Sequence, residues 1–288
     1  MPRKKSEVSE SAEMTFFEHI DALRPHLVRG IIVLFVLAIA AFFLRGVIID
    51  HILFGPRDPD FVTNRLLALI GELLGLRDLP VSNAEFHIVN TRMAGQFNLH
   101  MMVSLVSGLI VTTPYIVWEL WKFIKPALSS YERKRSNAFV FYVSLCFMAG
   151  LLFGYFVIAP ITVNFLTGYV ASDSITNMID VGSYLSTVLG ISLACGLLFE
   201  LPMLIYFLAK MGVVNSRMLK KYRRHAIVVL LIIAAVITPP DIMSQIIVVI
   251  PLLLLYELSI KIATKVEEKK KSEELESYTE IYGGKPGE

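Results

Sequence analysis

The feature that most constrains this chain is an apolar run at residues 184–208. Its 25 residues contain no Lys or Arg and one carboxylate, that of Glu200. An α-helix rises about 1.5 Å per residue, so the run can cross a hydrocarbon core about 30 Å thick, with Glu200 near the middle. A charge at that depth costs at least about 2.5 kcal/mol. The run therefore predicts a membrane-spanning helix in which Glu200 has a specific role, and Pro202 predicts a bend beside it.

The rest of the chain repeats this pattern. Hydrophobic residues make up 55% of the 288 residues, charged residues only 18%, and the mean hydropathy is +0.62. This composition is typical of multi-pass membrane proteins and excludes an ordinary soluble domain. We predict an all-α integral membrane protein of six transmembrane helices in a curved, concave bundle, with the last two spans short. The predicted spans are residues 27–44, 99–118, 138–161, 184–208, 226–238 and 242–260.

The distribution of positive charge predicts the orientation. Of the 27 Lys and Arg residues, 21 lie before the first predicted span or after the second, fourth and sixth, and Arg29 lies at the start of the first span. The remaining five lie together in the long loop at residues 45–97. Because cytosolic segments carry the excess of Lys and Arg, we expect both termini in the cytoplasm.

Four segments lie outside the predicted spans. Residues 1–13 are polar and predict a disordered cytosolic tail. Residues 14–24 predict an amphipathic helix along the inner membrane surface, from which Pro25 lets the chain turn into the first span. Residues 64–76 predict a short capping helix on the outer side, and the charged C-terminal tail predicts a helical extension. The predicted boundaries of tail, membrane domain and tail are residues 1–13, 14–262 and 263–288.

Two carboxylates stand out, and each has two interpretations. Glu200 is either a functional group inside the bilayer or a structural carboxylate hydrogen-bonded to a neighbouring helix. The functional roles open to it are a partner contact, a proton relay and the anchor of a polar cavity. Glu132 lies in a basic loop, three residues after Ser129. It either completes a capping box that opens the third span or is a ligand for an incoming cation.

Other classes of protein fit the sequence poorly. The histidines show no metal-binding spacing, and the chain has no Walker A or GxSxG motif, so we predict no metal, no cofactor and no enzymatic activity. Cys146 and Cys195 lie in apolar runs and predict no disulfide framework. Topology and anionic lipid explain the basic loops, so nucleic-acid binding is not predicted. The alternative function is a proton-coupled small-molecule transporter that uses Glu200.

Several short motifs, taken in order, resemble a known family. They are His19-Ile-Asp-Ala-Leu-Arg24, Trp121-x-Phe-Ile-x-Pro-Ala-Leu128 followed by Glu132-Arg133, Phe199-Glu200-x-Pro202, and Thr238-Pro-Pro-Asp-x-x-Ser-Gln245, with Pro56 after the first span. Each motif alone is modest, but their order and spacing in a six-span chain are specific. From about residue 16 to residue 262 the chain resembles TatC, the multi-span receptor subunit of the twin-arginine protein translocase.

The resemblance implies a cytosolic binding site for signal peptides that carry two consecutive arginines. In the family, acidic residues of the amino-terminal motif and of the first cytosolic loop bind this pair, and Glu132 matches the loop acid. Ala22 stands where the amino-terminal motif usually has Glu, so Glu18 and Asp21 are the candidates for the second acid. A guanidinium pairs bidentately with a carboxylate, which an ammonium does not. The implied signal-peptide-binding residues are Glu18, His19, Asp21, Arg24, Trp121, Phe123, Leu128 and Glu132.

The resemblance also implies partners, an energy source and a location. TatC-like proteins lie in the bacterial inner membrane and nucleate a translocation complex with TatA-type and TatB-type single-span subunits. The complex contains several copies of TatC and moves folded precursor proteins with the proton-motive force. Glu200 is the implied contact for a partner inside the bilayer. The implied structural residues are Pro56, Pro126, Pro202, Pro239, Pro240, Asp241 and Gln245.

Overall fold

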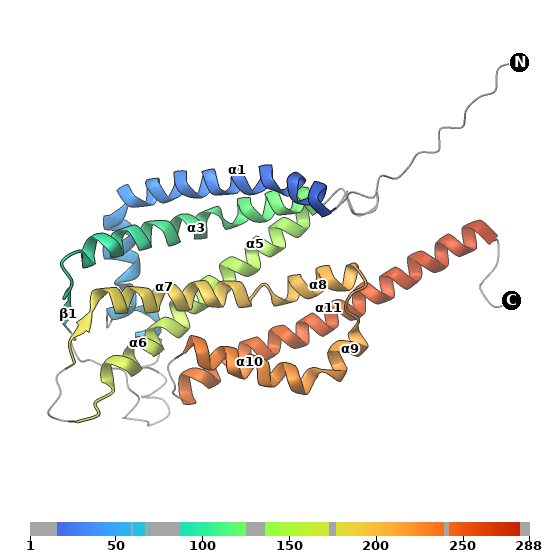
Figure 1. Ribbon diagram of the computed structural model, residues 1–288. Helices are drawn as coiled ribbons and strands as arrows, with labels where there is room; N and C mark the ends of the chain where they lie inside the picture. Colours follow the sequence, from blue (N-terminus) through green and yellow to red (C-terminus); the bar gives the residue numbers. More distant parts are fainter. Residues whose placement is uncertain are drawn as a thin grey trace, which may run out of the picture.

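The computed structural model describes residues 16–58, 60–66, 69, 87–124, 136–172, 177–238 and 242–282. These residues are mostly helical, and a pair of two-residue strands lies at one end of the molecule (Figure 1). Five described helical segments are long and apolar enough to cross a membrane: Asp21–Phe43, Gly95–Phe123, Phe139–Gly168, Val181–Lys210 and Gln245–Glu273. The prediction of a helical membrane protein is confirmed, while the count of six spans stays a prediction.

The first two long helices, α1 (Phe16–Phe43) and α3 (Gly95–Ile124), pack side by side along their length (Figure 1). They approach closely at Gly108, where an added Cβ would lie 2.7 Å from the backbone nitrogen of Ala38. Small residues allow membrane helices to bring their backbones together. A larger side chain at position 108 would therefore force the two helices apart.

Helix α1 continues through Pro25, so the prediction that the chain turns there after a separate surface helix is wrong. Proline has no backbone N–H and leaves the carbonyl of Asp21 without its helical partner. Asp21 is exposed near the start of the helix, where water can hydrate that carbonyl. Helix α1 thus runs through Pro25 and leads directly into the first predicted span.

The third long helix consists of three consecutive parts. They are α5 (Ser136–Phe153), the π-helical segment η4 (Gly154–Ile158) and α6 (Ala159–Gly168). Helix α7 (Val181–Leu198) packs against α5 and η4. An added Cβ at Gly150 would lie 2.5 Å from the carbonyl oxygen of Cys195, and one at Gly154 would lie 2.8 Å from the Cα of Ser192. Glycine at these two positions lets the helices approach closely.

The bend predicted at Pro202 is present. The chain leaves the helix at Phe199 and Glu200, between α7 and α8 (Leu201–Lys210). Pro202 is buried in the first turn of α8, where a missing N–H removes no helical hydrogen bond.

The last three helices form the C-terminal part of the fold. They are α9 (Ser216–Lys221), α10 (Arg223–Ile237) and α11 (Ile242–Tyr282). Helix α10 has only 15 residues, whereas α11 packs against α8 and extends the chain as a helix to Tyr282, as predicted for the tail. The carboxylate of Glu267 accepts hydrogen bonds from the backbone nitrogen and the hydroxyl of Ser216, at 2.7 and 2.6 Å. This contact fixes α11 to the start of α9.

The loop predicted at residues 45–97 contains more regular structure than expected. It includes the π-helix η1 (Gly46–Leu53), the 3-10 turn η2 (Gly55–Arg57) and the strand β1 (Ile88–Val89), which pairs in parallel with β2 (Ile179–Asp180). Residues 62–66 and 69 are helical, and the rest of the predicted capping helix lies outside the described residues.

The start of α1, the ends of α3 and α8 and the C-terminal part of α11 lie at one end of the molecule (Figure 1). We call this the inner end, because the predicted orientation places it in the cytoplasm, and we call the opposite end, with β1, the outer end. Helix α7 contributes many buried side chains to the core, among them Leu185 and Val188. Large apolar side chains of α1, α3 and α5 are exposed instead, as expected for surfaces that face lipid.

Candidate functional site

A buried carboxylate joins α1 to α3 at the inner end. Glu119 is only 2% exposed. One of its oxygens lies 2.6 Å from His26 Nδ1 and 3.9 Å from an Arg29 nitrogen, and the other lies 3.0 Å from Lys122 Nζ. The hydroxyl of Tyr115 is a further hydrogen-bond partner of Glu119. A buried charge needs such partners, and here they come from both helices. We call Glu119, His26, Arg29 and Lys122 the inner ion cluster.

The sequence reading ended the second span at Trp118 and assigned Glu119 to the following loop. In the structure α3 continues to Ile124, so Glu119 is helical and faces α1. The face of α1 that meets it carries His26 and, one helical turn earlier, Ala22. The structure therefore places a carboxylate of α3 one turn from the position where the family motif usually has Glu.

Trp121 lies in the interior, although it was predicted to bind a signal peptide directly. Its indole is 5% exposed, stacks on the ring of Phe139 at 4.0 Å and meets the ring of Phe207 at 6.5 Å. Phe139 in turn stacks on Tyr206 at 5.9 Å. These rings join α3 to α5 and α8. The burial of Trp121 favours a supporting role beneath the inner surface.

Phe123, Asp21 and Arg24 lie nearer the surface. Phe123 is partly exposed, with its ring 6.2 Å from that of His26. Asp21 and Arg24 are exposed on α1, and Asp21 forms no ion pair with any other described residue. The backbone at Glu18 and His19 belongs to the first turn of α1. The structure thus brings the amino-terminal motif beside the end of α3, while Pro126, Leu128 and Glu132 lie outside the described residues.

Glu200 occupies the break between α7 and α8. The residue is partly buried, and its oxygen Oε1 has no hydrogen-bond partner within the described part of the chain. It lies within electrostatic range of Cys146 on α5. An unpartnered buried acceptor is unfavourable, so this carboxylate is suited to a ligand or partner that donates a hydrogen bond.

The predicted structural residues lie at helix junctions. Pro56 is buried in η2, and its carbonyl accepts a hydrogen bond from the amide of Asn64 at 3.3 Å. The amide nitrogen of Gln245 on α11 lies 3.4 Å from the carbonyl oxygen of Leu231 on α10, so it ties these two helices together. Pro239, Pro240 and Asp241 lie outside the described residues. No group of three or more His, Cys, Asp or Glu side chains arranged to hold a metal occurs in the described part of the chain.

The sequence reasoning missed the roles of Glu119 and His26. A signal was present, because Glu119 lies among apolar and aromatic residues, where an unpaired carboxylate is unexpected. His26 and Arg29 are three residues apart and so share a helix face, but nothing in the sequence says which face Glu119 meets. The pairing spans 93 positions and became visible only in the folded chain.

Comparison with known proteins gives one consistent result. The model of the family described as "Sec-independent protein translocase protein (TatC)" matches residues 18–251. A TatC of Blattabacterium sp. subsp. Periplaneta americana is 40% identical over 264 residues, which cover 91% of this chain and 99% of the relative. TatCy of Bacillus subtilis is 31% identical, covering 87% of this chain and 89% of the relative.

Solved structures agree with the sequence comparison. Two crystal structures of the twin-arginine translocase receptor TatC are similar to this chain, with TM-scores of 0.63 and 0.66 and sequence identities of 29% and 31%. They cover 86% and 85% of this chain, and 99% of each solved chain is matched. The likeness therefore extends over nearly the whole membrane-embedded part.

Proposed function

Because the chain belongs to the TatC family of Sec-independent protein translocase proteins, we propose that its inner end binds the twin-arginine signal peptides of folded precursor proteins. The family makes it a core component of a protein translocase. The proposal assigns to the inner end of this chain the first step of transport, the capture of the signal peptide.

The inner ion cluster is the observation that carries the proposal. It fixes the first turns of α1 against the end of α3 through Glu119, His26 and Lys122. Asp21 is exposed on α1, five residues before His26, and the ring of His26 lies 6.2 Å from that of Phe123. Glu132 follows α3 in the sequence, outside the described residues, and we assign it the second acid of the site. The proposed site thus combines carboxylates with the aromatic ring of Phe123 at the expected cytosolic end.

The chemistry of this surface suits a ligand with two arginines. Glu119 already has cationic partners, so its role is to position the helices, and the acids that meet the signal peptide are Glu132 with Asp21 or Glu18. An exposed carboxylate–guanidinium pair contributes only about 0–1 kcal/mol. Two pairs and an apolar contact with Phe123 therefore form a weak site. Weak binding is useful here because the site must release its cargo.

Glu200 supplies the second part of the proposal. Its unpartnered oxygen lies in the helix break between α7 and α8, within a predicted span. We assign it the contact with a membrane-embedded partner, either a TatA-type single-span helix or the signal peptide. Assembly of that partner with this chain, driven by the proton-motive force, would follow capture of the cargo.

The capture step is tested by export of a cargo with paired arginines from cells carrying Glu132→Gln. Glutamine preserves a capping box but removes the charge, so we expect export to fall while the protein level stays normal. Asp60→Asn is the matched control, because it removes an exposed carboxylate at the outer end. Unchanged export in the Glu132→Gln strain would refute the role of its charge.

The intramembrane contact is tested with Glu200→Ala. We expect this variant to accumulate in the membrane at a normal level and to lose cross-linking to the single-span partner. If the variant fails to accumulate, Glu200 is a structural carboxylate and the proposed contact is wrong. Glu200→Gln, which can still form hydrogen bonds, should retain part of the cross-linking.

A further inference from the structure

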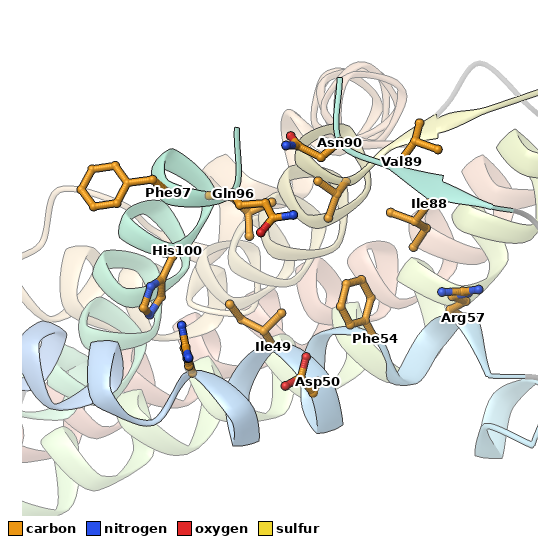
Figure 2. Close-up of a pocket in the computed structure, with 13 residues that line it drawn as sticks. Ile49, Asp50, Phe54, Arg57, Ile88, Val89, Asn90, Gln96, Phe97 and His100 are labelled. Atoms are coloured by element: carbon orange, nitrogen blue, oxygen red, sulfur yellow. The ribbon is translucent and has the colours of Figure 1, made fainter. Parts of the chain in front are cut away.

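A cavity of about 520 Å³ lies at the outer end, far from the inner ion cluster. Figure 2 shows Asp50 and Arg57 on the segment that follows α1, Asn90 beside β1, and Gln96 at the start of α3. Arg45 completes the polar lining together with His100. The walls thus come from the first outer loop and the start of α3, and they carry both signs of charge.

Positive charge prevails in this lining. Two arginines, Arg45 and Arg57, line the cavity together with a single carboxylate, that of Asp50. Arg45 forms no ion pair with any other described residue. Helix α3 begins at the cavity and has no acidic residue in its first turn, so its N-terminal dipole adds to the positive potential. The amide of Gln96 is a further hydrogen-bond donor, while the amide of Asn90 already donates to the carbonyl of Arg92 at 2.9 Å. These groups favour an anionic ligand with several acceptor oxygens, such as a phosphate.

The surroundings of the cavity are apolar and exposed. Phe43 is 79% exposed, Phe97 is 62% exposed, and Leu44 and Val47 flank Arg45 with more than half of their surface open. Such side chains at the ends of apolar helices face lipid. A ligand at this place therefore meets a polar cavity and an acyl-chain environment together, as a phospholipid does.

We propose that this cavity binds the headgroup of an outer-leaflet phospholipid that carries both a phosphate and an ammonium group, with the phosphate on Arg45 and the ammonium on Asp50. The ammonium group of such a headgroup explains why the lining contains a carboxylate in addition to two arginines. A primary ammonium also donates hydrogen bonds to a carboxylate, which a quaternary one does not. The proposal is independent of the inner-end site and of any cargo.

The test is a lipid titration of the purified full-length protein, followed by native mass spectrometry. Phosphatidylethanolamine and phosphatidylglycerol are the two lipid probes, and the variants are Arg45→Gln and Asp50→Asn. We expect Arg45→Gln to weaken the binding of one molecule of either lipid about tenfold, the effect of one lost charge-assisted hydrogen bond. Asp50→Asn should weaken the binding of phosphatidylethanolamine by a similar factor. It should leave the binding of phosphatidylglycerol unchanged or make it tighter.

The matched control is Arg65→Gln, an exposed arginine of the same outer end that pairs with Asp60 and does not line the cavity. Binding that is equal in Arg45→Gln and Arg65→Gln would overturn the site. If Asp50→Asn lowers the affinity for both lipids equally, the proposed contact between the ammonium group and Asp50 is wrong. If millimolar glycerophosphoethanolamine displaces the bound lipid, the occupant is a soluble phosphate compound and the assignment to a membrane lipid is wrong. An unfolding temperature of Arg45→Gln equal to that of the wild-type protein shows that the variant is folded.

Discussion

The two ends of the molecule are held together by different chemistry. At the inner end a single carboxylate, Glu119, joins the side chains of His26, Arg29 and Lys122, which belong to α1 and α3. At the outer end hydrogen bonds between neutral groups join the segments instead. The amide of Asn164 donates to the side chain of Asn64 at 3.0 Å, and the hydroxyl of Tyr184 donates to the carbonyl of Leu53 at 3.2 Å. Thr63 and Tyr155 donate to the carbonyls of Phe156 and Ile52.

The difference follows from what each end must satisfy. The π-helix η1 ends at Leu53, so its last carbonyls lack intrahelical partners and need hydroxyl donors. A neutral donor satisfies a carbonyl without bringing a charge into an apolar region. At the inner end Lys122 and Arg29 keep 36% and 58% of their side-chain surface exposed, so water stabilises their charges. The contacts of the inner ion cluster should therefore respond to salt and to changes of charge, whereas the hydrogen bonds between neutral groups at the outer end should not.

The largest effect is expected for Glu119→Leu. The substitution removes the acceptor of Lys122 and His26 and leaves their polar groups partly desolvated. Breaking a buried ion pair from one side costs about 3–5 kcal/mol, and the partial exposure of Lys122 puts this case near the lower limit, about 3 kcal/mol. Thermal unfolding of the purified protein in detergent measures the loss.

The double variant Glu119→Leu with Lys122→Met is the control for this prediction. It replaces an ion pair by two apolar side chains, an exchange that is often neutral. We expect it to regain more than half of the stability lost in Glu119→Leu. An equal loss in both variants would mean that packing of the Glu119 side chain, and not its charge, holds α1 to α3.

Asn164→Ala should have the next largest effect. Both asparagines are buried, and without Asn164 the side-chain oxygen of Asn64 has no described donor. An unsatisfied buried acceptor costs about 1–3 kcal/mol, so we expect a loss of about 2 kcal/mol. The loss should be the same at low and high salt, unlike that of Glu119→Leu. A salt-dependent loss in Asn164→Ala would remove the distinction between the two ends.

Tyr184→Phe should cost less, about 1 kcal/mol, because the hydrogen bonds of its hydroxyl, among them the one to Leu53, are neutral and the ring remains packed against Phe54. Tyr169→Phe is the matched control, since Tyr169 is exposed. Thermal unfolding of the two variants side by side gives the comparison. Equal stability of both would show that the contact with Leu53 contributes nothing to holding η1.

Much of the fold was predictable from hydropathy and from turn residues. Apolar runs of sufficient length marked the long helices, and Pro202 marked the break between α7 and α8. The continuity of α1 was not predictable, because proline ends a helix in most contexts and is tolerated where the freed carbonyl meets water. The π-helix η1 was missed because its residues read as an irregular loop after the first span.

The candidate site was predictable only in part. The resemblance to TatC indicated which surface to examine, and the exposed position of Asp21 fits that expectation. The roles of Glu119 and Trp121 depend on contacts between segments far apart in sequence, which residue patterns do not encode. Glu119 appeared to lie in a loop, and the burial of Trp121 depends on rings of α5 and α8.

The smallest effect concerns Asp180, a carboxylate in the otherwise neutral outer network. Burial opposes its charged form, but hydrogen bonds from the backbone of Ser183 and Gly182 and from Thr91 outweigh burial and lower its pKa below the ordinary value of 3.8. A lowered pKa contributes stability that is present above pH 3.8 and is lost as the pH falls through the folded-state pKa. The advantage of the wild-type protein over Asp180→Asn should therefore begin to fall as the pH approaches 3.8 from above, and it should shrink further as the pH drops below that value. The difference in unfolding temperature between the two proteins cancels the titration of all other groups. A difference that does not change with pH would mean that asparagine caps α7 equally well, and that charge plays no part at the outer end.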